Sequence, residues 1–182
     1  MQYFVIASRA LIGVIFLVAL VHKVVRRPRC AAFVDSAGVM RLGPTPLAGS
    51  AAGTVVAAEG TICVLLAVPA DAAVAAGFAV AAWLLSAYAV GIGHTIRRGA
   101  TTSGRRSGPS AAALGSRHIG RNALLIAVSM GGELAVLARP PAATAAGTAM
   151  ATCAGLVAGV LVIVMDDLAA LFGATTIDST RR

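Results

Sequence analysis

The chain has 182 residues, of which 58% are hydrophobic and 12% are charged, and its mean hydropathy is +0.88. Soluble domains are about 45–50% apolar and about 25% charged, so this composition excludes an ordinary soluble protein. The net charge of +8 would suggest a nucleic-acid partner in a soluble chain, but here we expect the basic residues to orient the chain in a membrane. The sequence therefore predicts an all-α integral membrane protein, one transmembrane domain over residues 1–182, in contact with the lipid bilayer and with no nucleic acid.

The first apolar run covers about residues 3–22. It is predicted to be a retained helix rather than a signal peptide, because Arg9 interrupts its start and no small-residue cleavage site follows. The basic residues from His22 to Arg29 end this helix. The second run, about residues 47–68, reads LAGSAAGTVVAAEGTICVLLAV and is long enough to cross a bilayer, since a span needs about 20 mainly apolar residues.

Three further apolar runs follow, at about residues 72–96, 119–138 and 145–171. Between the first two of them, residues 97–118 are rich in glycine, serine and arginine and are predicted to form a flexible cytoplasmic loop. The runs together predict a bundle of five transmembrane helices. Glycine pairs four residues apart, at Gly49 and Gly53 and at Gly155 and Gly159, are typical of helices that approach each other closely in a membrane.

The basic residues predict the orientation of this bundle. All lysines and arginines except Arg9 and Arg139 fall after the first helix, in the segment from Arg97 to Arg121, or at the C-terminus. Because cytoplasmic loops collect basic residues, we expect the N-terminus outside and the C-terminus in the cytoplasm of a cell that carries the protein in its plasma membrane.

A carboxylate near the middle of the second run, Glu59, marks the predicted polar centre. An ionisable group at bilayer depth costs at least ~2.5–3.5 kcal/mol, so it needs a partner, a proton or a function. Arg9 and Glu133 fall at one level on the outer side. Two interpretations remain open: an Arg9–Glu133 pair that only joins helices, or a polar pocket in which Glu59, Glu133 and Arg9 are catalytic and Glu59 is a general acid or base.

Side chains near this centre are candidates for binding a lipophilic small molecule. Phe78, Trp83 and Tyr88 lie inside the third run rather than at its ends, and Cys63 follows Glu59 by one helical turn. The alternative for the aromatic residues is ordinary packing. No cofactor is expected from these residues.

The spacing of the cysteines and of the metal-ligating residues gives little support for a thiol site or a metal site. Cys63 and Cys153 should lie at similar depth, as a thiol pair or as small buried hydrophobic residues. Several metal-ligating residues fall near the cytoplasmic face without the spacing of a metal site, so no metal is expected; they are His22, His94, His118, Asp166 and Asp167.

Four segments carry a resemblance to a known family. They are LIGVIFLVALVHK after Arg9, AAEG around Glu59, RRG from Arg97, and LGSRHIGRNALL from Leu114 to Leu125. In this order, over roughly residues 5–130, the chain resembles the MauE branch of the DoxX-like membrane proteins. The resemblance implies a four-helix core, to which the run at 145–171 adds one helix, and a role in redox-linked maturation that includes disulfide handling in a partner protein.

The chain departs from this family in one loop. The family's role depends on a Cys-x-Cys-Phe-Gly motif after the third helix, where this chain reads ATTSGRRSGPS. A thiolate is the nucleophile of disulfide exchange, and this loop has none. We therefore expect the fold to be shared and the thiol mechanism to be absent.

Three functional hypotheses follow from the sequence. The first is a small membrane enzyme doing acid–base chemistry without thiols, such as cyclisation or isomerisation of a lipophilic substrate, for which Glu59 supplies the acid or base. The second is a non-catalytic accessory or maturation protein for a membrane or redox partner. The third is a thiol-redox protein that uses Cys63 and Cys153. A homo-oligomer and a membrane partner protein are both left open.

Overall fold

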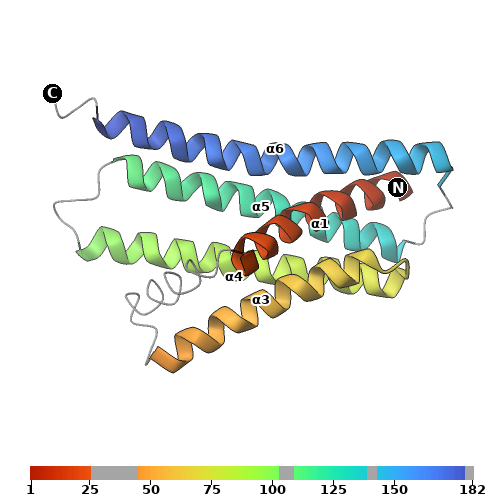
Figure 1. Cartoon of the computed structure of the whole chain (residues 1–182), viewed down its shortest axis with the longest axis horizontal. Coiled ribbons are helices and arrows are strands. Elements are labelled where there is room, and N and C mark those ends of the chain that lie inside the picture. The colour runs from red at the N-terminus through yellow and green to blue at the C-terminus, as the bar shows by residue number, and fades with distance from the viewer. Residues whose placement is uncertain (26–44, 103–108, 139–142, 179–182) are drawn as a thin grey trace.

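The structure is a computed structural model that describes residues 1–25, 45–102, 109–138 and 143–178. Within these ranges the chain is helical and contains no strand (Figure 1). The described helices are α1 (Gln2–Val25), α3 (Thr45–Ala67), α4 (Asp71–Thr102), α5 (Pro109–Leu137) and α6 (Ala145–Asp178). The prediction of an all-helical membrane bundle is confirmed.

Four of these helices contain stretches that are long and apolar enough to cross a membrane: Gln2–Val25, Asp71–His94, His118–Leu137 and Ala145–Met165. The remaining helix, α3, has 23 residues, and its stretch Gly53–Ala67 is apolar. At ~1.5 Å per residue α3 is about 35 Å long, which matches the hydrocarbon thickness of a bilayer. The chain is therefore a multi-pass membrane protein.

The segment at 97–118 differs from the predicted loop. Helix α4 continues to Thr102 and α5 begins at Pro109, so most of this segment is helical. Proline suits the first position of a helix because its missing N–H has no partner there, and the alanines that follow Pro109 favour helix. The abundance of glycine and serine in the segment hid this start.

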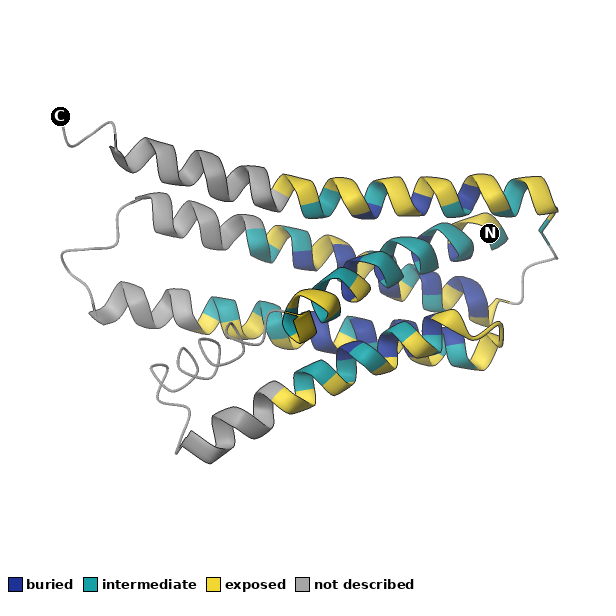
Figure 2. Ribbon diagram, in the orientation of Figure 1, coloured by how far each residue is buried: buried dark blue, intermediate teal, exposed yellow. Residues whose placement is uncertain are grey.

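Helix α1 lies at the centre of the bundle. It packs against α6 on one side and against α3 and α5 on the other, while α4 packs on α5 and α3. The most buried side chains lie where α1, α3, α4 and α5 meet (Figure 2). They include Ile12, Ile62, Phe78 and Leu125. Up to Met165, where its side chains are described, α6 exposes most of its large hydrophobic side chains, as expected for a helix that faces lipid.

Glycines allow α6 to approach α1 closely. A β-carbon at Gly155 would overlap the carbonyl oxygen of Ala7, and one at Gly159 would overlap Val14. The close approach predicted from this glycine pair is therefore confirmed. The other pair behaves differently, because a β-carbon at Gly53 would meet no atom within 4 Å, and Gly49 lies outside the described side chains.

We predict that Gly155→Ala destabilises the bundle, because the added methyl group meets backbone that cannot move without shifting α1. Overpacking of this kind costs about 1–3 kcal/mol. The matched control is Gly60→Ala, at a helical position with no atom within 4 Å of a new β-carbon, where alanine should stabilise by up to about 1 kcal/mol. Thermal unfolding in detergent, followed by circular dichroism, measures both. Equal melting temperatures for the two variants would contradict the α1–α6 packing.

Candidate functional site

The candidate site is built around the carboxylate of Glu59 on α3. This side chain is 1% exposed. Ile62 and Leu66 follow at helical spacing and are buried as well, so Glu59 lies on the face of α3 that points into the bundle. The burial of this carboxylate inside the bundle agrees with the expectation from the sequence.

Lys23 supplies the positive charge that Glu59 needs. It lies in the last turn of α1, and its Nζ donates to Glu59 Oε1 over 2.5 Å in an ion pair. Lysine carries its charge on a flexible four-carbon stem, so a residue at the end of a helix can place its ammonium group deeper than its own backbone. The pair joins α1 to α3.

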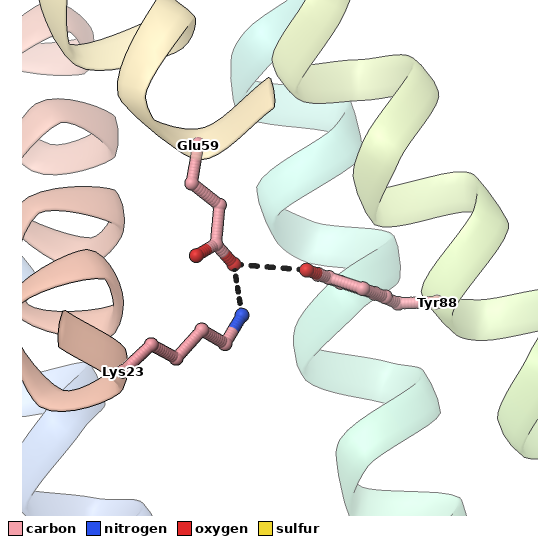
Figure 3. A network of polar contacts seen from close by, with 3 residues as sticks. All are labelled: Lys23, Glu59 and Tyr88. Atoms are coloured by element: carbon pink, nitrogen blue, oxygen red, sulfur yellow. Dashed lines mark hydrogen bonds and ion pairs between the residues drawn. The ribbon is translucent and has the colours of Figure 1, made fainter. Parts of the chain in front are cut away.

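A third helix contributes Tyr88. Its hydroxyl donates to the same oxygen, Glu59 Oε1, over 2.8 Å (Figure 3). The Lys23 ammonium also lies 5.8 Å from the centroid of the Tyr88 ring, within the range of a cation–π interaction. One carboxylate oxygen therefore connects α1, α3 and α4. We call Lys23, Glu59 and Tyr88 the triad.

The other carboxylate oxygen of Glu59 differs from Oε1 in its hydrogen bonding. Glu59 Oε2 is buried and accepts no hydrogen bond within the described residues. A buried polar atom without a partner costs about 1–3 kcal/mol, more if it is charged, and therefore asks for an explanation. Chemically, this oxygen is able to accept one more hydrogen bond or a proton.

Arg9 and Glu133 do not join this site. Arg9 lies fourteen residues before Lys23 in α1, about 21 Å along the helix axis. Its Nε donates to the carbonyl of Leu66 and its Nη2 to the carbonyl of Val68 over 3.2 Å. The last carbonyls of a helix have no partner inside it, so Arg9 satisfies the end of α3.

Glu133 is half-buried on α5, and within the described residues no ion pair joins it to Arg9. The predicted pocket of Glu59, Glu133 and Arg9 is therefore not assembled there, and the cation beside Glu59 is a lysine. The physical reason is that the free carbonyls of α3 lie within reach of Arg9.

The four predicted lining residues do not lie together around one site. Phe78 is fully buried and packs against Gly132 of α5, and Cys63 is half-buried one turn beyond Glu59. Trp83 is 69% exposed, so it faces away from the triad. Tyr88 lies at the site, but it contributes a hydroxyl group rather than an apolar wall.

The thiols and the metal-ligating residues form no site in the part of the chain that the structure describes. Cys63 on α3 and Cys153 on α6 are free. Among the described residues, no three His, Cys, Asp or Glu side chains lie close enough together to hold a metal ion. Cys30 and the side chains of Asp166 and Asp167 lie outside the described residues.

Of the triad, only Lys23 is not singled out by the sequence analysis, which assigns Tyr88 a role through its ring rather than its hydroxyl group. A tyrosine inside an apolar helix normally finds a partner for its hydroxyl when buried, which points Tyr88 toward a polar atom. Lys23 was interpreted only as the basic flank of the first helix, although it still lies inside that helix.

The geometry defines a class: a multi-pass helical membrane protein in which a buried ion pair ties the first helices together. The sequence profile described as methylamine utilisation protein MauE matches residues 1–138, and the chain belongs to this family. The match contains α1, α3, α4 and α5, so α6 lies beyond it. No curated protein and no solved structure matches the chain.

We predict that Lys23→Met destabilises the bundle more than Glu59→Gln. Without Lys23 the buried carboxylate loses the ion-pair partner found among the described residues, whereas without Glu59 the lysine can extend to the membrane surface. Removing one partner of a buried pair costs about 3–5 kcal/mol in soluble proteins. The double variant should lose less than the sum of the two single variants, which a double-mutant cycle from denaturant unfolding measures. Additive losses would show that the pair does not stabilise the fold.

A second prediction concerns the Tyr88 hydroxyl. Tyr88→Phe removes a hydrogen bond to a charged group and should cost about 1.5–3 kcal/mol. The matched control is Tyr3→Phe, which removes the hydroxyl that contacts Thr144 at an exposed position and should cost less. Melting temperatures of the two variants in the same detergent make the comparison. A smaller loss at Tyr88 than at Tyr3 would contradict the role given to the triad.

Proposed function

We propose that the chain is a non-catalytic accessory protein of the membrane that supports the maturation of a membrane or redox partner. The observation that carries this proposal is the engagement of Glu59 by Lys23 and Tyr88 from two other helices. A carboxylate that already accepts two donors, one of them a cation, is suited to holding helices in place. Membership of the MauE family agrees with a helper role.

Disulfide exchange is not part of this proposal. Residues 100–110 contain no cysteine, and Cys63 and Cys153 are free on different helices. Cys63 is half-buried and Cys153 is exposed on α6, and neither has a second cysteine beside it with which to form a disulfide among the described residues. The bundle itself, rather than a thiol pair, would support the partner.

The double variant Lys23→Met with Glu59→Gln tests the proposal. It removes both charges together, so it leaves no uncompensated ion and should fold. Expressed in a deletion strain, it should restore the abundance of membrane and exported proteins, measured by quantitative proteomics, as well as wild type does per folded molecule. A variant without cysteines (Cys30→Ser, Cys63→Ala, Cys153→Ala) should do the same. A folded double variant that restores nothing would show that Glu59 acts chemically.

A second candidate is a small membrane enzyme with acid–base chemistry on a lipophilic substrate, such as cyclisation or isomerisation. The observation in its favour is the buried Glu59 Oε2, which has no hydrogen-bond partner in the described part of the chain. That oxygen would exchange a proton with the substrate while Tyr88 and Lys23 hold the other oxygen. Mass spectrometry of lipid extracts from the deletion strain should then show an accumulated isomer that wild type removes and Glu59→Gln does not.

We also propose that the protein lies in the plasma membrane with its N-terminus outside and its C-terminus in the cytoplasm. The distribution of lysine and arginine supports this orientation. A green fluorescent protein fused to the C-terminus should fluoresce, because it folds in the cytoplasm. Alkaline phosphatase fused at the same point should be inactive, because it matures only outside. The reverse pattern would overturn the orientation.

A further inference from the structure

A cavity of about 600 Å³ lies at the end of the bundle where α1 begins. It is open on one side, and its lining comes from the first turns of α1, the turn between α3 and α4, the end of α5 and the start of α6, which lie at the right of Figure 1. This volume is within the range of about 300–1,000 Å³ that is typical of small-molecule sites. The triad is at the other end of α1, so the cavity is separate from the site described above.

Two opposite charges line this cavity, Arg9 and Asp71. Arg9 uses two of its donors on the carbonyls of Leu66 and Val68. A guanidinium group carries five N–H donors, so further donors remain. Asp71 is exposed at the first position of α4. Within the described residues neither Arg9 nor Asp71 takes part in an ion pair.

The remaining wall contains both polar and apolar side chains. Ile6, Val74 and Val136 line the cavity from three helices. Tyr3 and Phe4, on the neighbouring turn of α1, are exposed, as expected for aromatic side chains at a membrane interface. A ligand with an anionic group, a cationic group and a hydrocarbon part would therefore complement the side chains that line this cavity.

We propose that this cavity binds the zwitterionic headgroup of a phospholipid of the phosphatidylethanolamine type. The phosphate contacts Arg9, whose planar donors suit phosphate oxygens, and the ammonium group contacts Asp71. The upper part of the acyl chains lies against Ile6, Val74 and Val136. A headgroup with only negative charge fits less well, because it leaves Asp71 beside a like charge. This inference is independent of the accessory role proposed above.

Thermal unfolding of the full chain in detergent, with added short-chain lipids, tests the proposal. A ligand that binds only the folded state raises the melting temperature with its concentration. Phosphatidylethanolamine should raise the wild-type melting temperature more than phosphatidylglycerol does. Asp71→Asn should abolish this preference, and Arg9→Gln should abolish the effect of both lipids. Equal shifts for the two lipids in wild type, or an unchanged preference in Asp71→Asn, would overturn the proposal.

Two further measurements distinguish a lipid phosphate from a free phosphate. Inorganic phosphate and glycerophosphoethanolamine, which lacks the acyl chains, should raise the melting temperature much less than the lipid at equal concentration. A full shift with inorganic phosphate would overturn the lipid assignment and indicate a site for a free anion. A full shift with glycerophosphoethanolamine would overturn the role given to the apolar wall.

Control variants keep the test decisive. Glu133→Gln removes a carboxylate that does not line the cavity, so its lipid preference should match wild type. Because Arg9 also satisfies the end of α3, Arg9→Gln is able to unfold the chain. Ala143→Trp fills the cavity while both charges remain, and it should abolish the lipid effect. A folded Ala143→Trp variant that keeps the wild-type lipid shift would place the binding elsewhere.

Discussion

A carboxylate held away from water in a lipid environment is the constraint on which this bundle depends. Glu59 is tolerated at its depth because a lysine neutralises it and a tyrosine hydroxyl donates to it. The three residues come from α1, α3 and α4, so the cost of burying the charge is offset only when these helices are in register. A packed apolar interface alone specifies register weakly in lipid, because hydrocarbon tails are as apolar as leucine.

The two cations of α1 act on the same neighbour. Lys23, in the last turn of α1, bonds a side chain of α3, and Arg9, two turns into α1, bonds backbone carbonyls at the end of α3. Cationic side chains of α1 thus bond the antiparallel helix α3 at two separate places. Helix α6 is attached differently, through glycines that meet the α1 backbone. The polar contacts of Lys23 and Arg9 lie within the matched residues 1–138, whereas Gly155 and Gly159 lie beyond them.

The apolar parts of the described helices could be predicted from the sequence, because runs of about 20 apolar residues have few alternatives. The partners of the charged side chains could not be predicted, because the position of a residue along a helix gives the depth of its backbone and not that of its charged group. Long side chains move their charge away from that level, and Lys23 and Arg9 both do so. The directions of the side chains on α4 are easier to predict from the sequence. Trp83 and Tyr88 are five residues apart, about 140° around a helix, so only one of them is able to face the bundle. Phe78, Ala81 and Leu85 share the face of Tyr88 and are buried.

The charges at the two ends of α1 differ in whether they are already paired, and this difference indicates where a ligand would bind. At the triad, the negative charge of Glu59 is matched by Lys23 within hydrogen-bonding distance, which leaves one buried oxygen to offer. At the opposite end of α1, Arg9 and Asp71 line the same cavity without an ion pair among the described residues. A charge that is already paired gains little from a new partner, whereas charges that face a cavity gain a counter-charge when a ligand binds. The triad is therefore suited to holding helices, and the cavity is the better place for recognition.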